Sequence, residues 1–94
     1  MIKKSLMSNI IEFFCYQDDM PLEIQLEPEA VLFIASPENS IKFIAINCQD
    51  DFTWSVRIEG EERGLQLFPS TLGDYEVEVY ENDKLITDFY KYMK

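Results

Sequence analysis

The strongest constraint on the fold is a strict alternation of apolar and polar side chains in the second half of the chain. Two stretches show it, residues 52–59 and residues 75–80. Successive side chains of a strand point to opposite faces of a sheet, so this period of two predicts half-buried β-strands. The side chains expected on the buried faces are Phe52, Trp54, Val56, Ile58, Tyr75, Val77 and Val79.

Shorter segments carry related signals along the rest of the chain. Residues 22–26 alternate, residues 31–35 form a continuous apolar run, and residues 41–48 are apolar on both faces, as expected for a central strand. Residues 65–68 predict another short strand, and the polar residues 81–84 predict a hairpin turn. About seven short strands separated by polar turns predict an all-β fold, a small antiparallel two-sheet sandwich.

The two ends of the chain fit both a helix and a strand. Apolar residues recur at helical spacing in residues 6–14 and 85–93, but both segments are rich in β-branched and aromatic residues. The predicted turn favours a strand for residues 85–92, whereas the N-terminal segment stays open between a strand and a short helix. An α+β fold with terminal helices is the alternative. No linker or repeat divides the chain, so we expect a single domain over residues 1–94.

Residues 65–79 carry a resemblance to a known family. The stretch LQLFPSTLGDYEVEV has a loop with leucine, proline and glycine, then a tyrosine, then alternating valines. It resembles the tyrosine-corner region of immunoglobulin-like and fibronectin-type domains. The resemblance implies that the Tyr75 hydroxyl bonds back to the loop and that Trp54 is the buried aromatic of a central strand. The second cysteine of immunoglobulin domains is Val77 here. The resemblance implies a sandwich and no particular function.

The two cysteines, Cys15 and Cys48, lie far apart in apolar runs and form no CxxC motif. We expect reduced, buried thiols, with a disulfide between two strands as the alternative in an exported protein. No segment reaches the roughly 20 apolar residues of a membrane span. Glu12 interrupts the N-terminal apolar run, and no small-residue cleavage site follows it. We therefore expect a cytoplasmic protein.

The chain contains no histidine. This absence excludes Ser–His and Cys–His nucleophilic pairs, imidazole acid–base catalysis and histidine metal sites. No glycine-rich phosphate loop with a GK[ST] ending occurs. The adjacent carboxylates at residues 18–19 and 50–51 are expected to be solvated turn residues instead of a catalytic pair or calcium ligands. We therefore expect no enzymatic activity, no cofactor and no metal.

Acidic residues outnumber basic ones by 18 to 8, so the formal net charge is −10. Such a charge repels phosphate backbones and attracts basic proteins, so a protein partner is expected instead of nucleic acid. Residues 5–41 and 74–83 contain no lysine or arginine. Carboxylates with a tyrosine among them suit docking to a basic protein. The residues expected to bind the partner are Asp18, Asp19, Glu59, Glu61, Glu62, Glu76, Glu78, Tyr80, Glu81 and Asp83.

Small size, high acidity and the absence of catalytic groups are similar in general character to immunity proteins of contact-dependent and polymorphic toxin systems. This similarity implies a bacterial antitoxin, a cytoplasmic inhibitor that binds a basic nuclease toxin domain in a 1:1 complex. An acidic protein can fill the basic cleft in which such a nuclease holds phosphates. Two alternatives stay open: a phage-type DNA mimic that blocks a restriction or CRISPR effector, and a structural or adhesive β-sandwich module.

Overall fold

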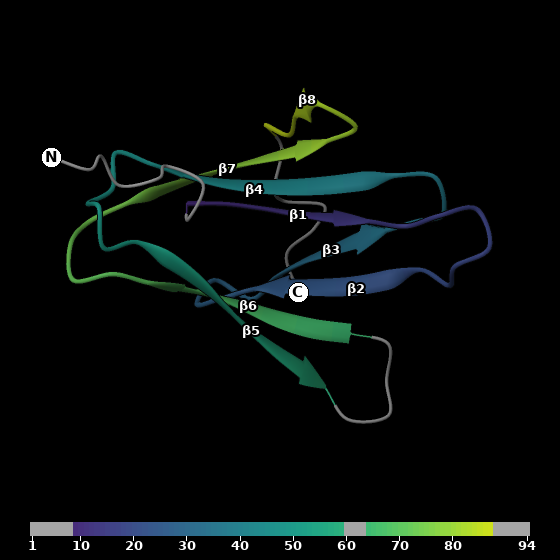
Figure 1. The fold of residues 1–94 in the computed structure, drawn as a ribbon, viewed down its shortest axis with the longest axis horizontal. Coiled ribbons are helices and arrows are strands. Elements are labelled where there is room, and N and C mark those ends of the chain that lie inside the picture. The colour runs from purple at the N-terminus through teal and green to yellow at the C-terminus, as the bar shows by residue number, and fades with distance from the viewer. Residues whose placement is uncertain (1–8, 60–63, 88–94) are drawn as a thin grey trace, which may run out of the picture.

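The computed structural model describes residues 9–59 and 64–87, which form two four-stranded sheets packed face to face (Figure 1). These residues contain no α-helix, so the predicted all-β fold is confirmed. Nothing in this part of the chain is a helix of the length and apolar character that crossing a membrane requires. The strands are β1 (Ile10–Phe14), β2 (Leu22–Leu26), β3 (Val31–Ala35), β4 (Ser40–Ile46), β5 (Thr53–Glu59), β6 (Gly64–Ser70), β7 (Glu76–Glu81) and β8 (Lys84–Leu85).

The two sheets differ in how their strands run. The first sheet has the order β1-β4-β7-β8, and all of its pairs are antiparallel. The second has the order β3-β2-β6-β5, in which β2 and β6 are parallel, with Ile24 opposite Leu65. The prediction of a wholly antiparallel sandwich is wrong for this pair. A tight hairpin forces neighbouring strands to be antiparallel, but β2 and β6 are joined by a long connection that leaves their relative direction to packing.

The hydrophobic core lies where the inner faces of the two sheets meet. The predicted central strand is confirmed, because β4 lies between β1 and β7 and its Phe43 is fully buried. The Phe43 ring meets Phe33 of the other sheet edge to face, with 5.4 Å between the ring centroids. The buried cluster consists of Cys15, Ile24, Leu26, Val31, Phe33, Ala35, Ile41, Phe43, Leu65, Leu67 and Val79.

Strand β5 lies at the edge of its sheet, so the expectation that Trp54 belongs to a central strand is wrong. Trp54 is half-buried, and its Nε1 donates a hydrogen bond to the Asn9 carbonyl at 3.0 Å. Val56 and Ile58 share the face of Trp54 but are 43% and 77% exposed. Figure 1 shows β5 diverging from the first sheet toward its C-terminal end, which leaves these two side chains uncovered although their alternation is that of a half-buried strand.

The ends of the described chain answer part of the ambiguity between helix and strand. Residues 10–14 form β1 and not a helix. The predicted hairpin turn is confirmed, because Asn82 and Asp83 connect β7 to β8 with φ angles of 51° and 67°. Two positive φ angles are the requirement of a type I′ turn. Of the strand predicted over residues 85–92, Leu85 belongs to β8, whereas Ile86 and Thr87 belong to no strand. The remainder of both ambiguous segments, residues 6–8 and 88–93, lies outside the described residues.

Cys15 and Cys48 are both free thiols. Cys15 is buried, with its Sγ 3.1 Å from the Ala35 carbonyl oxygen, whereas Cys48 is half-buried. Cys15 is hydrogen-bonded to Asn39, next to the start of β4, and Cys48 follows the end of β4. A strand of that length separates them by roughly 20 Å. A disulfide requires Cα atoms within about 7 Å of each other, so this fold does not allow the bond.

Candidate protein-binding site

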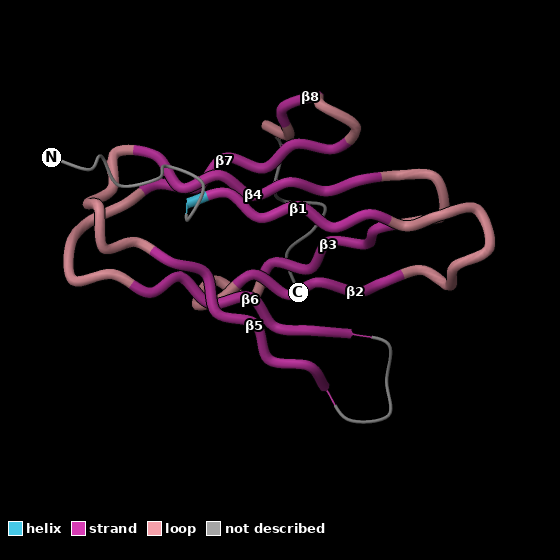
Figure 2. The backbone as a smooth tube through the Cα atoms, in the orientation of Figure 1, coloured by secondary structure: helices cyan, strands magenta, loops and turns pink. Residues whose placement is uncertain are grey.

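The connecting segments gather at the two ends of the sandwich (Figure 2). One end is formed by residues 27–30, 47–52 and 71–76, and we call it the acidic end. These three segments contain no lysine or arginine. The acidic end therefore carries negative charge without a basic residue in its own loops. Its carboxylate residues are Glu27, Glu29, Asp50, Asp51, Asp74 and Glu76.

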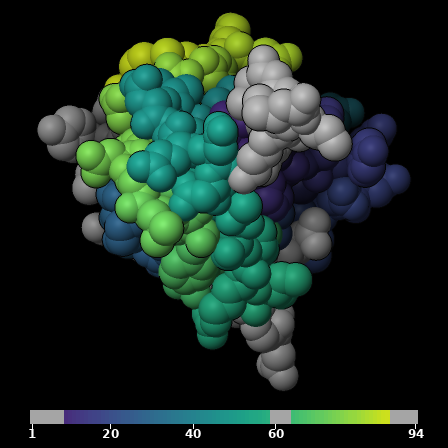
Figure 3. Space-filling model, turned by 60° about the vertical axis from the view of Figure 1, so that its left-hand side comes forward, coloured from purple at the N-terminus to yellow at the C-terminus, as the bar shows by residue number. Residues whose placement is uncertain are grey.

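Two loops of the acidic end are tied together by Asp51. One carboxylate oxygen of Asp51 accepts a hydrogen bond from the Thr71 hydroxyl at 2.6 Å, and the other accepts one from the Leu72 N–H at 2.9 Å. The Thr71 hydroxyl oxygen also accepts a bond from the Gly73 N–H at 3.3 Å. Figure 3 brings this end forward and shows the teal segment around residue 50 against the green segment after β6. The loop is thus ordered, yet it leaves the Leu72 side chain 96% exposed.

The same two loops make close contacts beneath the surface. A Cβ atom at position 73 would collide with the exposed side chain of Gln49, which would have to move aside to admit it. Phe52 is fully buried and meets the Tyr75 ring edge to face, with 5.5 Å between centroids. Phe52 also contacts Trp54 at 5.0 Å. An aromatic row therefore anchors the acidic end to the core.

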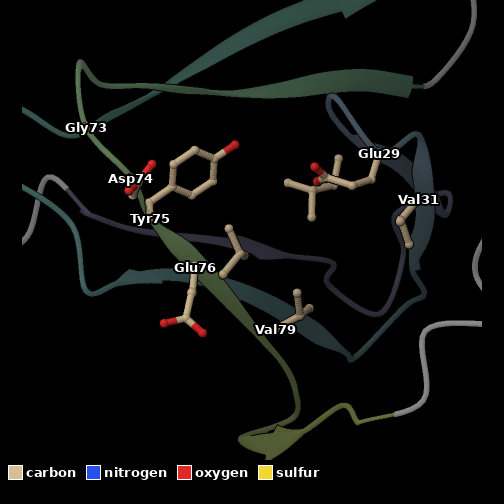
Figure 4. A pocket seen from close by; sticks show the side chains of 9 residues that line it. Glu29, Val31, Gly73, Asp74, Tyr75, Glu76 and Val79 are labelled. Carbon is tan, nitrogen blue, oxygen red and sulfur yellow. The ribbon is translucent and has the colours of Figure 1, made fainter.

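A cavity of about 640 Å³ opens at the acidic end, between β7 and the turn that joins β2 to β3. Cavities of roughly 300–1,000 Å³ are the size that holds ligands or protruding side chains. Its walls combine apolar side chains from both sheets with three carboxylates and a tyrosine (Figure 4). The lining residues are Leu26, Glu29, Val31, Gly73, Asp74, Tyr75, Glu76, Val77 and Val79.

The cavity is accessible because the first sheet is narrow on this side. Strand β8 pairs only with Tyr80 and Glu81, so the first half of β7 has no neighbouring strand beyond it among residues 9–59 and 64–87. Val77 is only partly buried in consequence. The space between the two sheets is therefore open here because β8 is too short to extend along the first half of β7.

Tyr75 and Glu29 point toward one another across the cavity, whereas Glu76 points away from it (Figure 4). Burial raises the pKa of the Tyr75 hydroxyl above its usual value, and the negative charge of Glu29 raises it further. The Tyr75 hydroxyl forms no hydrogen bond with any described residue, so the bond to the loop that the family resemblance implies does not occur among them. The hydroxyl faces the cavity instead.

Glu27 at the same turn serves a structural role. Its Oε2 accepts hydrogen bonds from the side-chain amides of Gln25 at 2.6 Å and Gln66 at 2.7 Å. Gln66 in turn accepts a bond from Arg57 of β5. This chain of polar contacts crosses three strands on the outer face of the second sheet. The Glu27 carboxylate is thus satisfied internally, unlike the Glu29 carboxylate, which points into the cavity.

Three of the predicted partner-binding residues lie together on the first sheet, and a fourth, Asp83, lies in the turn that follows. Glu76, Glu78 and Tyr80 share its outer face, and the Tyr80 hydroxyl donates a hydrogen bond to Glu78 at 2.9 Å. This bond, followed by burial, raises the pKa of Tyr80. Lys42 of β4 lies opposite Tyr80, 5.6 Å from its ring centroid, and forms an ion pair with Asp83 at 3.6 Å. The pairing of β4 with β7 thus places the Lys42 ammonium next to residues 74–83, which contain no lysine or arginine of their own.

The other predicted residues are dispersed. Asp18 and Asp19 lie in the turn after β1, at the end opposite the acidic end, where Asp19 accepts a hydrogen bond from the Tyr16 N–H at 2.8 Å. Glu81 is half-buried at the end of β7. Glu59 ends β5. Glu61 and Glu62 lie outside the described residues.

Sequence reasoning missed Glu29, Leu72 and Asp74, and assigned Tyr75 only a structural role. Each of the three is a single residue in a turn, and the one available signal was the apolar Leu72 within a polar loop. No three acidic or cysteine side chains in the described part of the chain are grouped so that they could hold a metal ion. Comparison of the chain with protein families, curated proteins and solved structures gave no match.

Proposed function

We propose that this protein binds a basic protein through its acidic end and neutralises it. The observation that carries the proposal is the exposed Leu72 next to a carboxylate-lined cavity. Burial of this side chain, which is 96% exposed on an ordered loop, would contribute favourable free energy to binding. Carboxylates around such a contact steer a basic protein toward it and oppose acidic competitors.

The partner that fits best is a nuclease toxin domain, and the role is that of a cytoplasmic immunity protein in a 1:1 complex. A nuclease must keep lysine and arginine in its cleft to hold phosphates. A net charge of −10 raises the rate at which such a cleft is found, by about 10- to 1,000-fold at low salt. The acidic end would occupy the cleft and exclude the substrate.

Co-expression with the product of the adjacent gene tests this function. We expect that product to be toxic to cells by itself, the present chain to restore growth, and the two proteins to purify as a stable 1:1 complex. Nuclease activity of the purified partner should disappear on addition of an equimolar amount of the chain. A harmless neighbour that forms no complex would exclude the proposal.

The location of the interface is tested by a matched pair of double variants. Glu29→Gln/Asp74→Asn removes two charges at the cavity, and Glu23→Gln/Asp18→Asn removes two from exposed positions elsewhere. We expect the first variant to slow association about tenfold at low salt, and the second to change it less than about twofold. Because Asp18 was itself expected to bind the partner, a larger effect of the second variant would place the interface at the opposite end.

A further inference from the structure

The cavity at the acidic end has two chemically different parts. Leu26 and Val31 from the second sheet and Val77 and Val79 from β7 supply apolar walls. The remaining walls carry carboxylates, and none of the lining residues that belong to segments 9–59 and 64–87 is basic. If a neutral, apolar group filled the cavity, the carboxylates would lose their contact with water and gain no positive charge in return, which costs free energy. The cavity therefore suits a group that is apolar along its stem and positively charged at its tip.

Tyr75 and Glu29 mark where the charged tip would lie. Their side chains point toward one another across the cavity (Figure 4). The negative charge of Glu29 raises the pKa of Tyr75, so the carboxylate acts electrostatically at the tyrosine hydroxyl. A cation placed between them would meet the Tyr75 hydroxyl oxygen, which can accept a hydrogen bond, on one side and a carboxylate on the other.

Arginine matches this arrangement better than lysine. Its planar guanidinium carries five N–H donors in a fixed fork, so it can pair with a carboxylate through two parallel hydrogen bonds and donate a further one to the tyrosine hydroxyl. The ammonium of lysine is more strongly hydrated and lacks this fixed fork of donors. The methylene stem of arginine can lie along apolar walls while its charged end stays near the carboxylate.

We infer that the cavity receives one arginine side chain of the basic partner, with its stem against the apolar walls and its guanidinium between Tyr75 and Glu29. This inference rests on the proposed function, since it names the group of the partner that enters the acidic end. It commits to a protein side chain, and the partner protein supplies it from a protruding loop or strand.

The test uses N-acetyl-L-arginine N-methylamide as a probe and the full-length protein, followed by amide chemical shifts. We expect saturable shifts at Gly73, Tyr75 and Val77, with a dissociation constant of roughly 1 mM, as befits so small a ligand. The citrulline derivative has nearly the same shape without the charge, and should bind at least about tenfold more weakly. Equal binding of the two probes, or shifts confined to another part of the surface, would overturn the inference.

Single variants assign the contacts. Glu29→Gln should raise the dissociation constant of the arginine probe about fivefold or more, because the carboxylate is removed. Tyr75→Phe removes the hydroxyl acceptor and should raise it about threefold, and Tyr75→Leu, which removes the whole ring, should weaken binding at least as much. Glu23→Gln on the outer face of the second sheet is the control and should have no effect. If Tyr75→Leu does not fold, the Glu29→Gln result alone decides, since Glu29 is exposed.

The same variants separate the inference from the proposed function. If the adjacent gene product is neutralised but Glu29→Gln and Tyr75→Leu leave the affinity of that complex unchanged, the function stands and the arginine contact is wrong. If the arginine probe binds at the cavity but no toxin is neutralised, the cavity chemistry stands and the proposed function is wrong. Each exposed arginine of the partner is then replaced by glutamine. The arginine that enters the cavity is the one whose replacement weakens the complex as much as Glu29→Gln does.

Discussion

Asp51 and Leu72 come from different loops, and the Asp51 carboxylate accepts a hydrogen bond from the Leu72 N–H at 2.9 Å. The other oxygen of the same carboxylate binds the Thr71 hydroxyl. The carboxylate thus provides hydrogen-bond partners for polar groups of the loop between β6 and β7, which have no strand partners. These bonds also hold the backbone from which the exposed Leu72 side chain projects. A side chain held in place before binding loses less conformational entropy when a partner covers it.

Replacing Asp51 by alanine should loosen this loop. We expect Asp51→Ala to lower the free energy of unfolding by about 1–2 kcal/mol in urea denaturation, because two hydrogen bonds are lost at the surface. Amide hydrogen exchange at Leu72 should become faster than that expected from the change in global stability alone. Asp18→Ala at the opposite end serves as the control and should leave Leu72 exchange unchanged. Slow exchange at Leu72 in Asp51→Ala would contradict the role given to this carboxylate.

Gly73 should accept a side chain at lower cost when Gln49 is shortened. The φ angle of Gly73 is not positive, so alanine meets no backbone strain, but its Cβ would collide with the Gln49 side chain. We expect Gly73→Ala to cost roughly 1 kcal/mol and Gln49→Ala by itself to cost little, since Gln49 is exposed. The double variant should recover most of the loss. Additive costs in a double-mutant cycle would show that the two residues do not interact.

Phe52 and Ile58 lie at the start and toward the end of the same alternating stretch, yet they should differ sharply in their contribution to stability. Phe52 is 1% exposed and Ile58 is 77% exposed. We expect Phe52→Ala to lower the free energy of unfolding by about 3–5 kcal/mol, and Ile58→Ala by less than about 0.5 kcal/mol. Denaturant unfolding of the two variants measures the difference. Similar losses would mean that the end of β5 is covered in solution.

The ionisation of Tyr75 should depend on Glu29. The pKa of Tyr75 is raised above 10.0 by burial and by the Glu29 charge, so the folded protein holds this proton more tightly than the unfolded chain. Tyr75 therefore contributes stability that is present below about pH 10 and is lost as the pH rises through its pKa in the folded state. Glu29→Gln should lower that pKa in a tyrosinate absorbance titration, with Glu23→Gln as the unchanged control. An identical titration of Glu29→Gln and the wild type would rule out this coupling.

The β7–β8 turn should be stabilised by glycine. Asp83 has a φ angle of 67°, which glycine adopts without the strain of a side chain. Its ion pair with Lys42 contributes little, because the Asp83 side chain is 84% exposed. We expect Asp83→Gly to raise the free energy of unfolding by about 0.5–1 kcal/mol. Asp83→Asn removes the charge but tolerates the same backbone, and should change stability less; a large loss in Asp83→Asn would show that the ion pair matters.

Much of the local structure was predictable. The strands at residues 22–26, 31–35 and 76–81 and the turn at 82–83 follow from side-chain period and from residues that tolerate positive φ angles. These features depend on neighbours within a few positions of each other. The exposure of Ile58 was not predictable in the same way, because it depends on how far the opposite sheet extends.

The candidate site shows the same division. Glu76, Glu78 and Tyr80 were among the residues predicted to bind the partner, and they share one face of the first sheet because alternate residues of a strand always do. Their role in binding stays a prediction. The pairing of Glu29 with Tyr75 had no local signal, since the two residues come from turns in different parts of the chain.

The sequence by itself determined that this protein is an acidic all-β domain without histidine chemistry, because period, composition and charge are properties of residues in order. Only the tertiary structure decided that β2 and β6 run parallel, that Lys42 lies against Tyr80, and that the turn after β2 and the loop before β7 meet around a carboxylate-lined cavity. Strand partners are selected by competition among distant segments for burial and hydrogen bonds. The outcome of this competition cannot be inferred from the alternation of neighbouring residues. The site formed by segments that are distant in the sequence is therefore recognised only in the folded structure.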